Sequence, residues 1–307
     1  MTDMRPLRIH DLPRVYRLAG QGVSFDTHLN LTVGDDAWQQ VVLTSRGRTQ
    51  PYVLRQGGES GIGVLHYPTG DLYARLAYIA PSLAHGASEG LWLSMLDGLT
   101  VMGGSHGAVN LIAEVDEGAP ELDLLRQAGF ATYARQEIWV RETTANEGEH
   151  DVPLRPAHMA DEPAILSLYG LFVPGLLKQV APLPTAADQT YVLEGKHGLC
   201  AAIPVYRGTR AALIEVYLLS KVCGDGAPVL NAVVEKLNGH VRPVYCRMRY
   251  QSEKVSHALE RAGFKIMTRQ MLMIRHTAVR ISQPGLARAA GLENGIPLPT
   301  PFTELYK

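Results

Sequence analysis

LLRQAGFATYARQEIWVRE, which runs from Leu124 to Glu142, and ALERAGFKIMTRQMLMIRH, which runs from Ala258 to His276, share one frame. In both stretches A-G-F is followed by four residues, then R-Q, four more residues and R. Each begins with a helix-like run that ends at a glycine, a residue that takes the left-handed conformation closing many helices. A strand is expected to begin at the phenylalanine. A chain that repeats such a unit is predicted to hold two copies of one fold.

The beginnings of the two copies also correspond. Pro6-Leu7-Arg8, followed by a polar His-Asp stretch, is echoed by Pro153-Leu154-Arg155, which is followed by His158 and Asp161. Between the copies, ETTANEGEHD (142–151) is polar, acidic and poor in apolar residues, as linkers are.

These boundaries divide the 307 residues in a way that agrees with a prior of about 150 residues per domain. We predict an N-terminal domain over residues 1–142, a linker over 143–151, a C-terminal domain over 152–276 and a tail over 277–307. The tail is rich in Pro, Gly and Ala, and either disorder or an extended strap over a domain would fit it.

Composition excludes several classes of protein. The net charge is −1, whereas nucleic-acid-binding proteins usually carry an excess of basic residues, so a DNA or RNA partner is not expected. No apolar run approaches the roughly 20 residues of a membrane span, and the N-terminus does not have the order of a signal peptide, so a cytoplasmic protein is predicted. The three cysteines form no C-x-x-C pair and the histidines have no metal-ligand spacing, so reduced thiols and no metal site are expected.

Local patterns inside the first copy predict an order of elements. A short helix over 13–18 is followed by two strands joined at Gly57-Gly58, an apolar run over 72–80, and a periodic helix over 91–102. A buried strand over 109–115, a helix over 122–127 and a last strand complete the copy. This order predicts an α/β (α+β) fold in which helices flank both faces of a mixed, mostly antiparallel sheet.

Each copy also carries a central strand followed by a loop rich in small residues. Leu76–Pro81 (LAYIAP) precedes His85–Gly90 (HGASEG), and Glu215–Ser220 (EVYLLS) precedes Cys223–Pro228 (CGDGAP). With the G-F ending, this strand and loop resemble the GNAT superfamily of acyl-CoA-dependent N-acyltransferases. The resemblance implies two tandem GNAT-like domains.

The resemblance further implies acetyl-CoA or CoA as a cosubstrate. Small residues at a helix N-terminus let main-chain amides approach a pyrophosphate, and an amide where the central strand splays from its neighbour would hold the oxyanion. The first copy is expected to be the better cradle, because Asp225 adds negative charge to the second loop and Pro228 removes a donor. The alternative is that both loops are ordinary turns in a diverged fold. The predicted cofactor-binding positions are Ile79, His85, Gly86, Ala87, Ser88, Gly90, Leu218, Gly224 and Gly226.

Glu215 is the candidate catalytic base, since the resemblance places it at the start of the central strand, where a carboxylate can take the proton of an ammonium group. Its alternative is a buried salt bridge with Arg247 or Arg249. Other family positions depart from the pattern. Leu125 and Leu259 stand where many relatives carry a tyrosine that protonates the leaving thiolate, and Gly118 and Ser252 stand where an asparagine is usual.

Tyr133, Tyr217 and Tyr245 are possible substitutes for the missing acid, although tyrosines on strands more often serve packing.

The predicted function is acyl-CoA-dependent N-acyl transfer, with acetyl-CoA as the expected donor, to an amine of a small molecule or peptide that attacks the thioester directly. The alternative is a catalytically inactive tandem module that binds a small molecule, CoA or a protein. A third arrangement has one half binding CoA while the other shapes the acceptor groove. No nucleic-acid or membrane partner is expected, and a monomer is favoured because a tandem can satisfy its sheet pairing within one chain.

Overall fold

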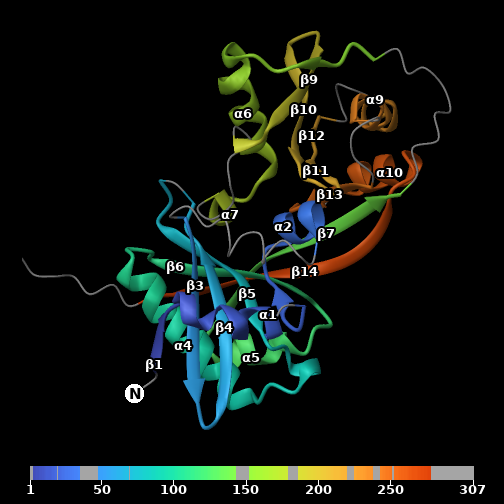
Figure 1. Cartoon of the computed structure of the whole chain (residues 1–307). Coiled ribbons are helices and arrows are strands. Elements are labelled where there is room, and N and C mark those ends of the chain that lie inside the picture. Colours follow the sequence, from blue (N-terminus) through green and yellow to red (C-terminus); the bar gives the residue numbers. More distant parts are fainter. Residues whose placement is uncertain are drawn as a thin grey trace, which may run out of the picture.

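The computed structural model describes residues 3–18, 20–34, 48–68, 70–142, 152–178, 186–219, 225–237, 243–250 and 252–277. Its strands form one mixed sheet of 14 strands with helices on both faces, which confirms the predicted fold class (Figure 1). The path through the sheet is β1-β3-β4-β5-β6-β14-β7-β13-β11-β10-β9-β8, and two short strands, β2 and β12, pair with β5 and β10.

The elements of the N-terminal half are β1 (Asp3–Pro6), α1 (Leu12–Leu18), β2 (Val23–Ser24), α2 (Thr27–Val33), β3 (Thr49–Gln56), β4 (Glu59–His66), β5 (Tyr73–Ala80), α4 (Glu89–Ser105), β6 (Asn110–Asp116), α5 (Glu121–Gln127) and β7 (Ala131–Arg141). Those of the C-terminal half are β8 (Arg155–Pro156), α6 (Glu162–Phe172), α7 (Gly175–Lys178), β9 (Gln189–Gly195), β10 (Gly198–Arg207), β11 (Ala212–Glu215), β12 (Tyr217–Leu218), α9 (Ala227–Leu237), β13 (Val244–Met248), α10 (Glu253–Arg261) and β14 (Lys265–His276). Short 3-10 turns precede α1, α4 and α6.

The repeated A-G-F frame folds as expected. Gly129 follows α5 and Gly263 follows α10, with φ of 83° and 79°, in the left-handed region that favours glycine. Phe130 and Phe264 are buried beyond them, and each leads into a long strand, β7 or β14. The repeat therefore predicts both turns and both strands correctly.

The two halves exchange these last strands. β14 lies between β6 and β7, and β7 lies between β14 and β13, all antiparallel, so each half donates its final strand to the sheet of the other. The two long strands run side by side where the halves meet (Figure 1). Gln136 is paired with Gln270, its equivalent in the repeat, and Gln136 Nε2 donates to Gln270 Oε1 at 2.8 Å. A local twofold axis therefore passes between these two glutamines.

The two halves do not form separate sheets, because all the strands belong to one. The predicted linker, residues 143–151, lies outside the described residues, as does the tail beyond Thr277. Thr277 itself continues the pairing of β14, since its N–H donates to the Val109 carbonyl at 2.9 Å. Strands of the two halves pair with each other within one chain, as was expected.

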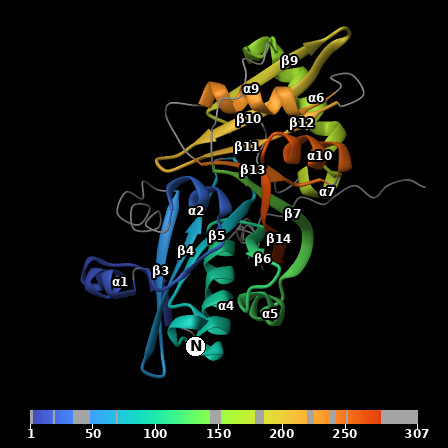
Figure 2. The ribbon, with the colours of Figure 1, turned by 90° about the vertical axis from the view of Figure 1, so that its right-hand side faces the viewer.

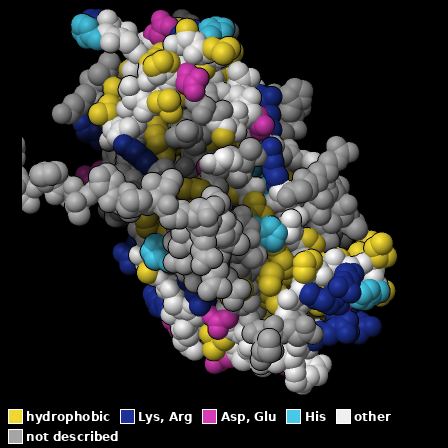
Figure 3. All heavy atoms as spheres, turned by 90° about the vertical axis from the view of Figure 1, so that its left-hand side faces the viewer, with side chains coloured by type: hydrophobic (Ala, Val, Ile, Leu, Met, Phe, Trp, Pro, Cys, Tyr) yellow, Lys and Arg dark blue, Asp and Glu magenta, His cyan; other side chains and the backbone are white. Residues whose placement is uncertain are grey.

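The openings of the two halves match in a different register from the predicted one. Arg5 forms a two-pronged ion pair with Asp11, with N···O distances of 2.7 and 2.9 Å, and Arg155 forms the same pair with Asp161. The correspondence is therefore Arg5-Pro6 with Arg155-Pro156, and the alignment of Pro6-Leu7-Arg8 with Pro153-Leu154-Arg155 is wrong. The Arg5 guanidinium holds the pKa of Asp11 well below its usual range. On the face of the molecule shown in Figure 3, Lys and Arg side chains gather at the lower right.

A helix from each half covers the sheet of the other. Leu31 on α2 belongs to one hydrophobic cluster with Tyr206 and Leu213 of the C-terminal half, and Leu177 on α7 belongs to a cluster that includes Tyr73 and Ile112 of the N-terminal half. In the C-terminal half, α6 lies on one side of β9–β11 and α9 and α10 lie on the other (Figure 1). The same arrangement is seen from a second side in Figure 2.

One cysteine differs from expectation. Cys200 on β10 is disulfide-bonded to a partner outside the described residues, whereas reduced thiols were predicted. The spacing of cysteines along the sequence could not predict this disulfide, because the fold decides which segments lie next to Cys200. Cys246 is free and buried.

The described part of the chain contains no helix with the length and apolar character needed to cross a membrane. Within the same residues, no three side chains of the His, Cys, Asp and Glu types gather as a metal-binding group.

Candidate functional site

In the N-terminal half, the central strand β5 separates from its neighbour β6. The two strands pair in parallel only from Tyr73 to Arg75, opposite Asn110 to Ile112. Beyond Arg75 they splay, as the predicted site requires. The gap that results is the first candidate for a cofactor cleft.

The chain itself fills this first gap. β2 pairs with β5, and Phe25 bridges the two separated strands, because its N–H donates to the Ala77 carbonyl at 2.9 Å and its carbonyl accepts from the Glu114 N–H at 3.1 Å. The Phe25 side chain is only 2% exposed and packs edge-on against Trp92, with ring centroids 6.1 Å apart. A segment of main chain therefore occupies the place of a ligand.

This insertion uses the amide predicted to hold the oxyanion in the first half. In an antiparallel pair, hydrogen-bonded positions alternate, so the bond from Phe25 to Ala77 puts Val23 and Ile79 in the hydrogen-bonded class as well. The Ile79 amide is thus engaged by β2. A Cβ on Gly22 would lie 2.5 Å from the Ile79 carbonyl oxygen, so the close approach requires glycine here.

The loop after β5 is also closed upon itself. The N–H groups of His85 and Ala87 both donate to the Ser82 carbonyl, at 3.0 and 3.3 Å, and that of Gly86 donates to Leu83 at 3.1 Å. These donors are the ones that were expected to face a pyrophosphate.

At the start of α4, Ser88 Oγ accepts from the Leu91 N–H at 3.2 Å and donates to Glu59 at 2.5 Å, which places a carboxylate beside the loop. Gly90 lies in the first turn of the helix, with open space around its Cα. The expectation that the first copy is the better cradle therefore finds no support in the geometry.

The C-terminal half has the same splay without an inserted strand among the described residues. β11 pairs in parallel with β13 from Ala212 to Glu215, and the central strand then turns away at Val216 and continues as β12. The Leu219 N–H donates to the Cys200 carbonyl at 2.9 Å, so by alternation Leu218 is a non-bonded position relative to β10. Its amide faces the gap, as predicted for an oxyanion donor.

The second loop leads to an open depression between α9 and α10. Gly226 packs so closely on Leu218 that a Cβ would overlap that side chain, and Gly224 lies outside the described residues. Asp225 Oδ1 accepts from the Ala227 N–H at 3.2 Å, and Oδ2 pairs with Arg261 Nη1 at 2.7 Å, which compensates the negative charge that made this loop look poorer.

The depression measures about 570 Å³. Its lining residues are Asp225, Gly226, Glu253, Lys254, His257, Ala258 and Arg261. Lys254 and Arg261 bring two positive charges to this lining, and Asp225 and Glu253 bring two negative ones. The feature that suits a phosphate group is Lys254 next to the N-terminus of the 11-residue helix α9.

Glu215 is held in the salt bridge that the sequence left open as an alternative. It is 2% exposed, and its Oε1 accepts from Arg247 Nε and Nη2 at 2.9 and 2.6 Å, while Tyr217 donates to Oε2 at 2.7 Å. Burial raises the pKa of Glu215, but the guanidiniums of Arg247 and Arg249 outweigh it, and the pKa lies below its ordinary value. A carboxylate with these partners is a weak base.

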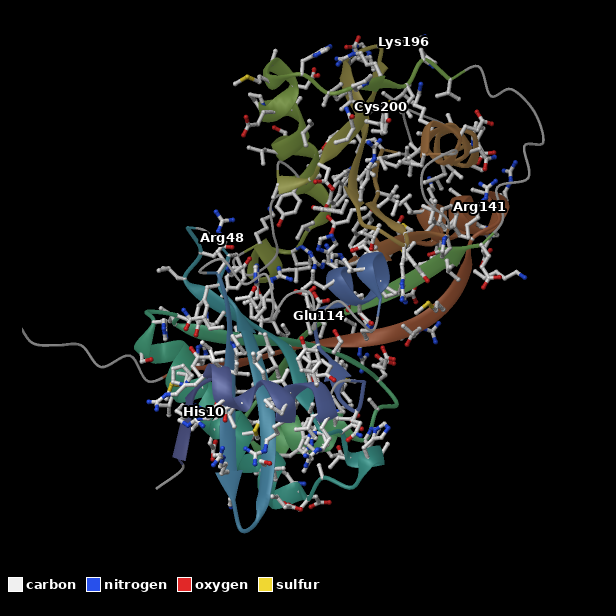
Figure 4. The ribbon with its side chains drawn as sticks, in the orientation of Figure 1. His10, Arg48, Glu114, Arg141, Lys196 and Cys200 are labelled. Carbon is white, nitrogen blue, oxygen red and sulfur yellow. The ribbon has the colours of Figure 1, made fainter. Side chains whose placement is uncertain are left out.

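A second glutamate, which the sequence analysis missed, faces Glu215 across the two halves. Glu114 on β6 lies within 3.3 Å of Arg249, 3.8 Å of Arg75 and 4.0 Å of Arg247. Figure 4 shows Glu114 at the level where the halves meet. Its only sequence signal is a carboxylate inside the apolar run VNLIAEV (109–115). We call Arg75, Glu114, Glu215, Arg247 and Arg249 the central charge cluster.

The three tyrosines proposed as substitutes for the missing acid differ in their surroundings. Leu125 and Leu259, at the positions where many GNAT proteins carry the acid, are fully buried in the two cores. The Tyr217 hydroxyl donates to Glu215. The hydroxyl of Tyr133 is buried and has no hydrogen-bond partner among the described residues.

The central charge cluster predicts an acid-sensitive fold. Burial raises the pKa of Glu114, but Arg247, Arg249 and Arg75 lower it to about 2 overall, below the unfolded value near 4.3. Stability from this group is therefore present above about pH 4.3 and is lost as the pH falls toward 2. We expect Glu114→Gln to lower the free energy of unfolding at pH 7 and to flatten its decline between pH 4.3 and 2, as measured by urea titration at each pH. An equally steep decline in the variant would contradict the assignment.

Similarity to known proteins is found at the level of structure. No protein-family model matches the chain, and neither does any curated protein. Solved structures do match it. A tandem GNAT protein from the clavulanic acid biosynthesis pathway is 15% identical with a TM-score of 0.54, over 90% of this chain and 98% of that one.

Two further structures agree over similar lengths. A GCN5-related N-acetyltransferase from Sphaerobacter thermophilus is 13% identical with a TM-score of 0.57, over 90% of this chain and 95% of that one. A putative acetyltransferase from Pyrococcus horikoshii is 10% identical with a TM-score of 0.52, over 91% and 90%. The chain therefore has the GNAT fold. More particularly, it has that fold in tandem, as the repeat in its sequence predicted.

Proposed function

We propose that this chain is an acyl-CoA-dependent N-acyltransferase of GNAT type whose single cofactor site lies in the C-terminal half. The observation that carries the proposal is the difference between the two gaps. β2 and Phe25 occupy the gap in the N-terminal half, whereas the gap beside Leu218 holds no inserted strand among the described residues and lies next to Gly226, which lines the depression together with Lys254. The N-terminal half then acts as the partner that completes the sheet and covers β11 with α2.

The residues of the C-terminal half fit a CoA molecule in three places. At the edge of the central strand, the Val216 carbonyl can accept a hydrogen bond from an amide N–H of the pantetheine arm. Lys254 and the first turn of α9 suit its phosphates. When bound, acetyl-CoA supplies an activated thioester, and the Leu218 amide is placed to stabilise the oxyanion.

Glu215 has a supporting role in this proposal. It fixes Tyr217 and the two arginines at the base of the gap, and its lowered pKa makes it a poor acceptor for the proton of an ammonium group. The acceptor is an amine of a small molecule or peptide. The three structural neighbours support the reaction class, since they are described as GNAT proteins or acetyltransferases. A monomer is proposed because the strand exchange that two chains would make occurs within one.

A calorimetric titration with CoA and acetyl-CoA tests the proposal. We expect one site per chain, and we expect Lys254→Glu to weaken binding about tenfold or more, since a charge-assisted hydrogen bond contributes about 1.5–3 kcal/mol. Lys236→Glu is the matched control, because it makes the same charge change at the other end of α9, and it should change affinity less than twofold. Two sites per chain, no binding, or equal effects of both variants would contradict the proposal.

A second candidate is a non-catalytic tandem module, which is favoured by the buried Leu259 at the position of the usual proton donor. Such a module would bind CoA without releasing thiol. Thiol release from acetyl-CoA in the presence of a panel of primary amines distinguishes the two candidates.

A further inference from the structure

Among the described residues, the side chain of Tyr250 crosses the gap of the C-terminal half. Tyr250 lies two residues beyond β13, and its hydroxyl donates to the Val216 carbonyl, where the central strand leaves β13. The ring forms a triangle with those of Phe172 and Tyr217: its centroid lies 5.0 Å from the first and 6.4 Å from the second, and those two are 6.3 Å apart. Burial raises the pKa of Tyr250, so its hydroxyl keeps its proton and remains a donor at neutral pH.

Tyr250 fills its gap in a different way from β2 and Phe25, which fill the gap of the N-terminal half. There, clearing the gap would break the main-chain bonds of Phe25 to both flanking strands and expose a buried ring. In the C-terminal half, clearing it requires one hydroxyl bond to break and a half-buried side chain to rotate, and side-chain rotation is a fast motion. The second gap is therefore closed in a reversible way.

The hydroxyl also occupies a position that a ligand needs. Alternate residues of a strand direct their main-chain groups to the same side, so the Val216 carbonyl faces the gap together with the Leu218 amide. An amide-bearing chain that completed this strand edge would use both groups. Tyr250 covers the acceptor and leaves the donor beside it.

We propose that Tyr250 is a gate of the acyl-CoA cleft. In the free protein its hydroxyl satisfies the Val216 carbonyl. On binding, an amide N–H of the pantetheine arm takes over this acceptor, and the tyrosine side chain moves out of the gap between β12 and β13. The inference rests on the proposed function, and it makes Tyr250 a positioning residue that sets cofactor affinity.

The test compares Tyr250→Phe with Tyr245→Phe, a control on the neighbouring strand β13 whose hydroxyl forms no hydrogen bond with the described residues. We expect Tyr250→Phe to bind CoA about fivefold more tightly than the wild type, because the competing internal hydrogen bond, about 1 kcal/mol, is gone. Tyr245→Phe should bind as the wild type does. In the free protein, hydrogen exchange across 216–219 should be faster in Tyr250→Phe than in the control.

The outcomes separate the gate from the function. If the wild type binds CoA and Tyr250→Phe binds with equal or lower affinity, the gate is wrong and the cofactor site stands. A lower melting temperature with unchanged affinity would likewise make Tyr250 a packing residue only. If neither the wild type nor Tyr250→Phe nor Tyr250→Ala binds CoA, the proposed function and the gate both fail. Binding by the variants alone would support a gate that is closed in the free chain.

Discussion

Arg247→Met is expected to lower the free energy of unfolding by about 3–5 kcal/mol, the typical cost of removing one partner from a buried ion pair. Arg247 is 3% exposed and lies between Glu215 and Glu114, one from each half. Without it, two carboxylates share the Arg249 guanidinium in a site that excludes water. Urea unfolding at pH 7, followed by circular dichroism, measures the loss.

Arg269→Met is the matched control. Arg269 on β14 pairs with Glu137 on β7, with an N···O distance of 3.2 Å, so this ion pair also joins the two halves. Its side chain, however, is 60% exposed. An exposed pair of this kind contributes less than about 1 kcal/mol. Losses of equal size for the two variants would show that the central charge cluster does not join the halves.

Phe25→Ala is expected to cost about 3–5 kcal/mol, since it removes a buried aromatic ring beside Trp92 and leaves a cavity. The loss should come with faster hydrogen exchange at 77–79, because Phe25 holds β2 in the gap between β5 and β6. Denaturant titration and exchange measured by mass spectrometry provide the two readouts.

Leu72→Ala serves as the control, because it truncates an apolar side chain of the same half that is 70% exposed. It should stay within about 0.5 kcal/mol of the wild type. If Phe25→Ala behaves like this control and exchange at 77–79 is unchanged, β2 is not a stable part of the sheet.

The repeated frame was sufficient to predict the fold because its signals are local. A glycine that ends a helix and an apolar strand beyond it depend on near neighbours, and both copies of them are confirmed at Gly129 and Gly263. The exchange of β7 and β14 is not local. Two copies of one repeat present similar strand edges, so the sequence pattern does not say which copy a last strand joins.

The site was predicted less well, for a related reason. Leu218 and Gly226 lie beside the gap of the C-terminal half, so they remain predicted cofactor-binding residues. Ile79 and the His85 loop do not serve as expected, because β2, a strand of two residues with no periodicity, pairs with the first, and the Ser82 and Leu83 carbonyls satisfy the second. Glu114 and Arg75 were missed because each is a lone charge in an apolar run, and its partners come from distant segments.

The local twofold axis makes Glu114 and Arg247 equivalent positions. Glu114 is opposite Leu272 on β14, and Arg247 is opposite Ile138 on β7, which are matching residues of the repeat. One site in the duplicated unit thus holds an acid in the first copy and a base in the second. Two N-terminal halves assembled about this axis would bring two carboxylates together, and two C-terminal halves would bring two guanidiniums together. Each copy is therefore suited to pair with the other and not with itself, so like-with-like assembly carries an electrostatic penalty that the covalent tandem avoids.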